Sequence, residues 1–119
     1  MNADGIKKRT KAFAHDVIKL AALLPRSVIG DHVGRQLIRC ATSVAANYRA
    51  ALLAQTKASF IAKISIVIEE SDETEFWLES IEDEQLLTAD RLLPLCREAY
   101  ELASIFIKTR KTAQSKGSG

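Results

Sequence analysis

The chain has 119 residues, 47% of them hydrophobic and 27% charged, a composition typical of one soluble globular domain. It contains only 5 Gly and 2 Pro, which argues against a turn-rich β sandwich or barrel and favours helices. The 17 Lys and Arg against 15 Asp and Glu give a net charge of +2, which alone indicates no nucleic-acid partner.

Neither a membrane span nor a secretion signal is expected. Even the apolar stretch 60–68 includes a lysine and a serine, whereas a span needs roughly 18 apolar residues. The first five residues lack the apolar segment of a signal peptide, so we expect a cytoplasmic protein with no membrane partner. Cys40 and Cys96 have no second Cys or His at metal-finger spacing, and both are expected to be small buried hydrophobes.

Apolar residues at three- and four-residue steps predict the first two helices. The first spans about residues 6–24 and ends before Pro25. The apolar pattern of the second starts near Val28, and its regular part spans about residues 31–54. Gly30 marks the turn before it, and Asp31 is the candidate N-cap.

The third helix is predicted to span about residues 57–87, with Thr56 as its N-cap. No Gly or Pro separates it from the second helix. We infer a break near Gln55 because one helix from residue 31 to 87 would be about 85 Å long, too long for a domain of this size.

The fourth helix is predicted to span about residues 90–111, after Thr88 or Asp90. Pro94 is tolerated if it lies in the first turn and otherwise kinks the helix. The small polar residues 112–119 are expected to form a flexible tail.

Four amphipathic helices with short connections predict an all-α fold, because short links place successive helices antiparallel. We therefore expect residues 1–119 to form a single domain, an antiparallel up-down-up-down four-helix bundle.

Two stretches have a recognisable pattern. The first, in the second helix, is Arg35-Gln36-Leu37-Ile38-Arg39-Cys40-Ala41-Thr42-Ser43-Val44-Ala45-Ala46-Asn47. The second, in the third helix, is Phe60 followed by Glu69-Glu70-Ser71-Asp72-Glu73 and Trp77-Leu78-Glu79. Over about residues 13–108 the chain resembles the 23S rRNA-intervening sequence protein family. It departs from many members after Asn47, where Tyr48-Arg49-Ala50-Ala51 replaces Ile-Ala-Glu-Gly, so no role of that Glu is transferred.

The resemblance implies a small antiparallel bundle that assembles into a homopentamer, and no catalytic activity is established for the family. A related branch, the accessory variability proteins of diversity-generating retroelements, consists of basic pentameric bundles that bind nucleic acid and a reverse transcriptase. The resemblance therefore implies a homo-oligomer, with an RNA or DNA backbone or another protein as further partners.

Antiparallel packing of the second and third helices places residues level when their numbers sum to about 111. Arg39 is then level with Asp72 and Glu73, and Arg35 is level with Glu75. Because the guanidinium group binds carboxylates in a bidentate way, these positions predict a ladder of ion pairs between the two helices.

Two further features concern packing and assembly. Asn47 lies on an Ala-rich face, where its amide either sets the register of a helix or subunit contact or stays exposed. Phe76 and Trp77 point about 100° apart, so one is expected in the core and the other at a subunit contact. The assembly or structural candidates are Arg35, Arg39, Asn47, Asp72, Glu73 and Trp77.

The acidic run 69–75 invites comparison with the di-metal sites of helical bundles. Those sites use Glu from two helices and Glu-x-x-His from the other two, whereas this chain has no Glu-x-x-His and two isolated histidines, His15 and His32. It also has no Gly-x-Ser-x-Gly motif and no phosphate-cradling loop. We therefore expect no enzyme activity, no metal and no cofactor.

The bundle order separates the charges along the axis. The end with both termini and the turn near Gln55 receives 11 basic residues and only Asp4, whereas the other half receives 6 basic and 14 acidic residues. One interpretation is that the lysines and arginines near the termini only keep the protein soluble. The other interpretation is that they form a surface that binds phosphate backbones. A ring of parallel subunits would place several copies of this surface side by side.

The second interpretation gives the functional prediction. The nucleic-acid-binding candidates are Lys7, Lys8, Arg9, Lys11, Arg49, Lys57, Lys63, Lys108, Arg110 and Lys111. We expect a non-enzymatic, self-assembling bundle that acts as a nucleic-acid-binding or interaction scaffold. The alternative is a protein-binding adaptor with no nucleic-acid role.

Overall fold

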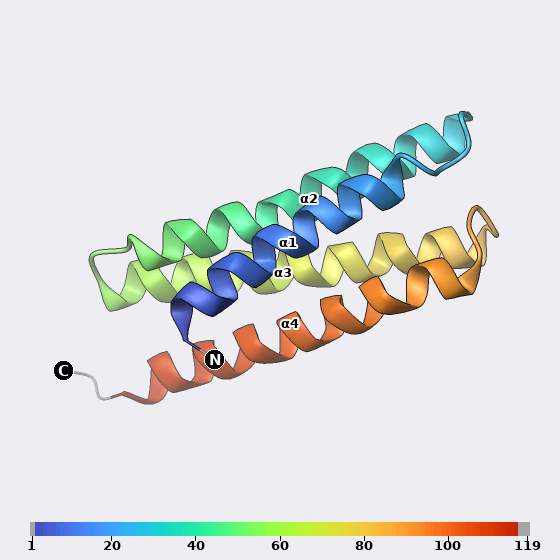
Figure 1. Cartoon of the computed structure of the whole chain (residues 1–119). Helices are drawn as coiled ribbons and strands as arrows, with labels where there is room; N and C mark the ends of the chain where they lie inside the picture. The colour runs from blue at the N-terminus through green and yellow to red at the C-terminus, as the bar shows by residue number, and fades with distance from the viewer. Residues whose placement is uncertain (1, 117–119) are drawn as a thin grey trace.

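The computed structural model describes residues 2–116. Its helices are α1 (Ala3–Ala21), α2 (Val28–Leu52), α3 (Lys57–Asp83) and α4 (Ala89–Ser115). Successive helices run antiparallel, so the start of α1, the α2–α3 turn and the end of α4 lie at one end of the bundle (Figure 1). The predicted all-α four-helix bundle is confirmed, and so is the break near Gln55.

Capping side chains set where α2 and α3 begin. The Ser27 hydroxyl accepts a hydrogen bond from the Gly30 amide (2.9 Å), and the Thr56 hydroxyl accepts one from the Ser59 amide (3.0 Å). The predicted Thr56 cap is therefore confirmed. The predicted Asp31 cap is wrong, because Ser27 starts α2 one turn earlier and Asp31 lies within its first turn.

The end of α3 falls four residues before the predicted boundary. Gln85 adopts the left-handed conformation, with φ at 54°, and its amide donates to the Glu82 carbonyl (3.0 Å). The Leu86 amide donates to the Ile81 carbonyl (2.9 Å), which completes a Schellman motif. Leu86 and Leu87 continue the apolar spacing, but they pack against the core from the turn that follows the helix.

The end of α4 falls four residues beyond the predicted boundary. Thr112–Ser115, which were expected to be flexible, are helical, and the amide of Lys116 donates to the Thr112 carbonyl (3.2 Å). Residues 117–119 of the predicted tail lie outside the described residues. Pro94 is in the second turn of α4, one turn later than the position where proline fits best.

The core is a continuous column of apolar side chains from all four helices. Leu37 on α2, Ile64 and Leu78 on α3, and Phe106 on α4 are fully buried. The rings of Tyr48 and Phe106 stack at a tilt with centroids 5.6 Å apart. This column explains why the apolar spacing predicted the helices correctly.

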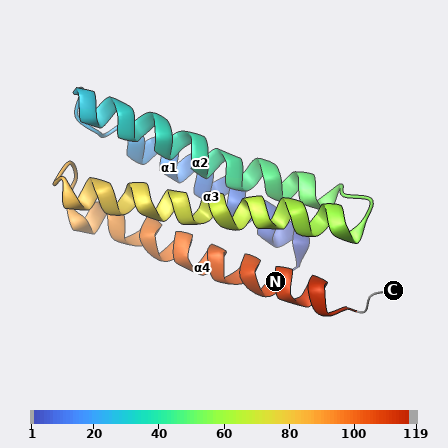
Figure 2. The same ribbon diagram turned by 180° about the vertical axis from the view of Figure 1, so that it is seen from behind.

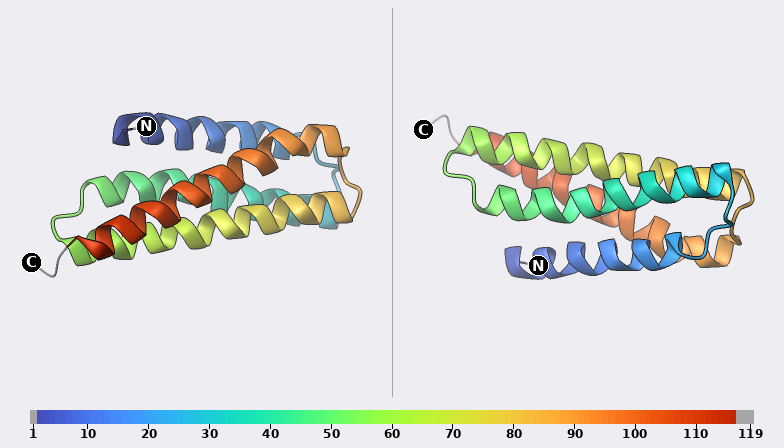
Figure 3. Two further views of the ribbon diagram at one scale, coloured as in Figure 1. Left: turned by 90° about the horizontal axis from the view of Figure 1, so that it is seen from below. Right: turned by 90° about the horizontal axis from the view of Figure 1, so that it is seen from above.

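The helices do not form a closed square. α2 packs against α1 and α3, and α3 packs against α4, whereas α1 and α4 have the smallest contact of the helices that lie side by side (Figure 2). α4 crosses the bundle obliquely, so its C-terminal half lies over α3 and away from the start of α1 (Figure 3). The bundle is consequently open between α1 and α4 at the end that holds both termini, which we call the basic end.

The opposite end, which we call the turn end, holds the α1–α2 and α3–α4 turns (Figure 1). Its α1–α2 turn is tightly packed around Gly30. A Cβ atom at Gly30 would lie 2.0 Å from the carbonyl oxygen of Pro25, so this position requires glycine.

Candidate nucleic-acid interface and assembly surfaces

The basic end consists of the N-terminal parts of α1 and α3 and the C-terminal parts of α2 and α4. On its α1–α2 side, three lysines and Arg49 surround a shallow pocket of about 310 Å³, with Asp4 as the one carboxylate in the lining. The exposed candidates are Lys8, Lys11, Arg49, Lys57, Lys108 and Lys111, and the half-buried ones are Lys7, Arg9, Lys63 and Arg110.

Arg9 is held by carboxylates of α4. Its Nε lies 2.7 Å from Glu98 Oε2, and its Nη2 lies 2.6 Å from Glu98 Oε1 and 2.9 Å from Glu101 Oε1. The hydrogen bonds to Glu98 and Glu101 raise the pKa of the guanidinium above its ordinary value. Arg9 therefore joins α1 to α4, and its charge is neutralised within the bundle rather than presented to a phosphate.

Two other candidates also have partners within the chain. Arg110 donates from Nη1 to the hydroxyl of Ser65 (3.2 Å), and the Lys57 ammonium donates to the Lys116 carbonyl (2.8 Å). Both contacts join α3 to the end of α4. The partner of Arg110 is a neutral hydroxyl, so this contact does not neutralise its guanidinium charge.

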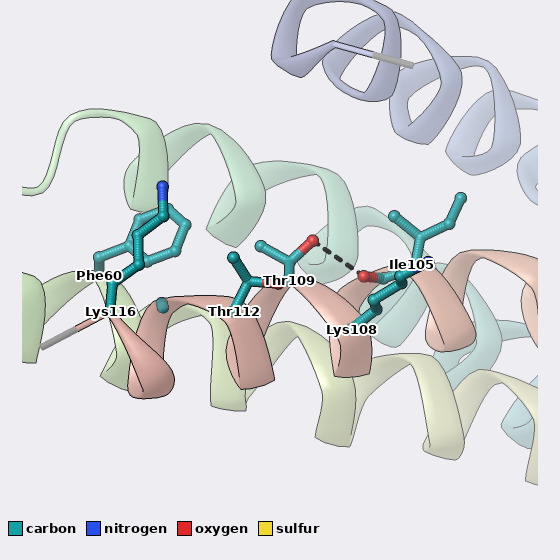
Figure 4. Close-up of a pocket in the computed structure, with 7 residues that line it drawn as sticks. Phe60, Ile105, Lys108, Thr109, Thr112 and Lys116 are labelled. Carbon is teal, nitrogen blue, oxygen red and sulfur yellow. Dashed lines mark hydrogen bonds between the residues drawn. The ribbon is translucent and has the colours of Figure 1, made fainter.

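A groove opens at the basic end where α1 does not cover α4. It has a volume of about 480 Å³ and is lined by Phe60, Ile105, Lys108, Thr109, Thr112, Ala113 and Lys116 (Figure 4). We call it the basic-end groove. Five of these residues lie at three- and four-residue steps on one face of α4, where a neighbouring helix would normally pack, and Lys116 is the C-cap that follows the helix.

The predicted ion pairs between α2 and α3 are confirmed at Arg39 only. Arg39 binds Glu73, and its Nη1 lies 3.2 Å from Glu70 Oε2. The indole Nε1 of Trp77 donates to Glu73 (3.1 Å). The prediction that Asp72 also pairs with Arg39 is wrong, because Asp72 lies on the far side of α3, beside α4.

The predicted pair of Arg35 with Glu75 is also wrong. Arg35 lines a groove of about 330 Å³ between α1 and α2, together with Arg26, Asp31 and apolar residues such as Ile38. Glu75 lines a groove of about 560 Å³ between α3 and α4. The numbering rule gives the correct level for contacts such as Arg39 with Glu73 and Cys40 with Thr74, but Arg35 and Glu75 line grooves between different pairs of helices.

The two outer grooves have opposite charge. The α1–α2 groove has two arginines and one aspartate, whereas the α3–α4 groove has Glu69, Asp72 and Glu75 around Ile68, Ile107 and the 68% exposed Tyr100. Burial, followed by the charges of Asp72 and Glu79, raises the pKa of Glu75 above its ordinary value. Glu75 is thus a carboxylate in an acidic environment.

Asn47 finds its partners within α2. Its amide nitrogen donates to the carbonyl (3.0 Å) and the hydroxyl (2.8 Å) of Ser43, so it bridges no two helices of the bundle. Trp77 is half-buried against the core, whereas Phe76 is 55% exposed. This agrees with one of the two rings lying inside and the other outside.

The cysteines differ in burial. Cys40 is buried, and Cys96 is half-buried. Burial raises the pKa of both thiols, and at Cys96 the charge of Glu82 contributes further. Both are therefore poor nucleophiles at neutral pH.

Residues 2–116 contain no group of three or more His, Cys, Asp or Glu side chains that could hold a metal ion. Within the same range, no helix is long and apolar enough to cross a membrane.

The comparison with known families matches residues 5–108 to the family described as 23S rRNA-intervening sequence protein. The chain belongs to this family. A crystal structure from Bacteroides thetaiotaomicron VPI-5482, described as a protein with unknown function from the S23 ribosomal protein family, has a TM-score of 0.83 and 29% sequence identity. The match covers 89% of this chain and 98% of that one. The search of curated proteins gives no significant match. For this family member, the relation to accessory variability proteins stays a prediction.

Sequence reasoning missed the carboxylates that bind Arg9 and the groove beside Phe60. Both depend on how α4 lies against α1, and these helices are not neighbours in the sequence. The oblique crossing of α4 has no signal in the apolar spacing, which fixes the buried face of a helix but not its tilt.

Proposed function

We propose that this family member is a non-enzymatic, self-assembling scaffold that binds the phosphate backbone of nucleic acid through its basic end. The observation that supports the proposal is the charge polarity: 11 of the 17 basic residues lie in the half of the bundle that holds both termini, accompanied by Asp4 and by Glu98 and Glu101, which bind Arg9. Arg9 is removed from this surface by its ion pairs, but the remaining cations come from all four helices. Backbone-directed binding of this kind is weak and strongly salt-dependent.

Self-assembly is supported by the two outer grooves. A basic and partly apolar face lies opposite an acidic and partly apolar face, so the first face of one subunit is complementary to the second face of another. Such a head-to-tail contact closes into a ring when the rotation fits, and the family resemblance suggests five subunits. In that ring the basic ends would lie side by side and form one broad cationic surface.

The nucleic-acid proposal is tested by neutralising exposed lysines of the basic end. We expect Lys8→Gln, Lys11→Gln and Lys111→Gln together to weaken RNA and DNA binding and to lower the slope of log K against log salt concentration by about 2. The control neutralises Lys19 and Arg91, exposed cations of the other half that line neither outer groove. A loss per cation equal to that of the basic-end variant, or no binding at low salt, would contradict the proposal.

The assembly proposal is tested by exchanging charges between the two grooves. Arg35→Glu and Glu75→Arg should each dissociate the oligomer seen by native mass spectrometry, and the double variant should restore it. Lys19→Glu, an exposed substitution outside both grooves, serves as the control. A chain that is monomeric at every concentration would contradict this proposal.

The same pairing predicts a pH dependence of assembly. Arg35 of a neighbouring subunit favours ionised Glu75, so the oligomer binds fewer protons than free subunits. Assembly should therefore strengthen as the pH rises through the raised pKa of Glu75 and weaken as it falls. The other titratable or charged groups around this carboxylate are Glu69, Asp72, Glu79, Cys96, Arg97, Tyr100 and Glu101.

A protein-binding adaptor is the second candidate. Leu53, which is 81% exposed at the α2–α3 turn, and Phe76 are apolar side chains that a partner could cover. An adaptor would keep its partner when the three lysines of the basic end are neutralised.

A further inference from the structure

We infer that the basic-end groove binds an unpaired base, so that the protein prefers single-stranded nucleic acid to a duplex. This inference rests on the proposed function and specifies which form of nucleic acid the basic end selects. Backbone contacts alone would not produce this preference, because duplex DNA has the higher charge density.

The floor of the groove suits the flat face of a base. Phe60 is half-buried at one end, and Ile105 and Ala113 are half-buried along α4. Figure 4 shows the Phe60 ring beside Lys116, with Ile105 at the far end of the same face. An aromatic ring next to cationic side chains is the arrangement on which unpaired bases stack, whatever their sequence.

The polar residues of the groove suit the rest of a nucleotide. Lys108 and Lys116 provide positive charge towards its two ends, where flanking phosphates would lie. The Thr109 hydroxyl donates its proton to the Ile105 carbonyl (2.8 Å), so it can only accept a hydrogen bond from a ligand. The exocyclic amino group of adenine, guanine or cytosine is such a donor.

The groove is held in shape from both sides. The Lys57 ammonium donates to the Lys116 carbonyl, and Arg110 donates to Ser65, so α3 and the last turns of α4 are joined across the floor. Beneath them, Phe106 and Tyr48 are buried against each other. The groove therefore exists before a ligand binds, which lowers the cost of ordering the site.

An acidic amphipathic helix from a protein fits the groove less well. Such a helix buries a continuous apolar stripe, whereas the two threonines interrupt the floor between its apolar residues. A docked apolar side chain would cover the Thr109 hydroxyl without giving it a donor, and this desolvation is unfavourable.

The test compares a labelled, unstructured 12-nucleotide strand with the blunt duplex of the same sequence, as RNA and as DNA, by fluorescence anisotropy at one ionic strength. The wild-type chain should bind the single strand more tightly. Phe60→Leu keeps an apolar side chain but removes the aromatic face, and should weaken single-strand binding at least about fivefold, the lower range for one stacked base. Duplex binding should not change.

Two further variants keep the result interpretable. Phe60→Trp retains a stacking surface and should preserve the preference, so it separates stacking from general damage at this position. Phe76→Ala removes an exposed aromatic ring of α3 outside the groove and should bind both ligands like the wild type. Helicity measured by circular dichroism checks that each variant is folded.

Equal affinity for both forms, or a preference that survives Phe60→Leu, would overturn the inference and leave backbone binding at the basic end intact. No binding of either form would overturn the inference and the proposed function together. Binding of an acidic helical peptide in place of nucleic acid, lost in Phe60→Leu, would overturn it by assigning the groove to a protein partner.

Discussion

The two ends of the bundle are built in different ways. At the turn end, the backbone itself is constrained: Gly30 lies against the Pro25 carbonyl, and Gln85 closes α3 in a left-handed conformation. At the basic end, α1 and α4 diverge and leave a groove lined by lysines and a phenylalanine. Structural requirements thus concentrate at the turn end, and groups suited to bind an external anion concentrate at the basic end.

This difference has a limit, because the basic end also contains core residues. Phe106, next in sequence to the groove residue Ile105, is fully buried. We expect Phe106→Ala to lower the free energy of unfolding by about 3 to 5 kcal/mol, measured by urea denaturation, because it leaves a large cavity. Ile107→Ala, on the exposed side of the same turn, is the control and should cost much less. A small loss for Phe106→Ala would mean that the basic end is loosely packed throughout.

The turn end is tested at its two glycines. Gly30→Ala should destabilise the bundle by about 1 to 3 kcal/mol, because the new methyl group forces the Pro25 carbonyl to move. Gly34→Ala is the matched control. Its Cβ would lie 3.5 Å from Leu24 Cδ1, an ordinary contact, and the better helix propensity of alanine should give up to about 1 kcal/mol of added stability. Similar thermal melts for both variants would contradict the tight turn.

Two arginines differ in how strongly their ion pairs stabilise the bundle. Arg9 is 20% exposed and binds two carboxylates of α4, so Arg9→Ala should cost about 1 to 2 kcal/mol. Arg39 is more exposed, and Arg39→Ala should cost less than about 1 kcal/mol. Thermal melting at low and high salt measures both. Arg9→Lys should recover only part of the loss, since an ammonium group cannot reproduce the bidentate contact with Glu98.

The smallest effect is expected at Gln85, and it is a gain. Gln85→Gly removes the side chain that strains the left-handed backbone at this position, and should stabilise the protein by about 0.5 to 1 kcal/mol. Gln85→Ala keeps the strained conformation and should give no such gain. A loss of stability in the glycine variant would show that the conformation of Gln85 is not a source of strain at the end of α3.

The sequence predicted the four helices better than it predicted where each helix ends or which neighbour each helix face contacts. Apolar spacing is a property of each helix alone, so all four helices were predicted, together with the Thr56 cap. The end of α3 was wrong because Leu86 and Leu87 fit the helical spacing while the turn at Gln85 has no glycine to mark it. Apolar spacing also did not extend α4 through Thr112–Ser115, because this stretch contains no large apolar side chain.

The sequence predicted which cations gather at the basic end but not which groups they contact. The cations of the basic end follow from the antiparallel order, which short connections impose. The partners of Arg9 and Arg35 require the rotation and tilt of each helix, and these depend on packing between segments far apart in the sequence. That is why the contact of Arg39 with Glu73 was predicted correctly and the partner of Arg35 was not.

The contact of α1 with α4 has a consequence for motion. Because Glu98 and Glu101 hold Arg9 where the two helices otherwise touch little, α1 is the element with the least lateral support on that side. Its amide hydrogens should exchange with solvent faster than those of α2 and α3, and raising the ionic strength should speed this local opening further. Opening of α1 would enlarge the space above α4, so ionic strength would act on the position of α1 as well as on the charge of the basic end.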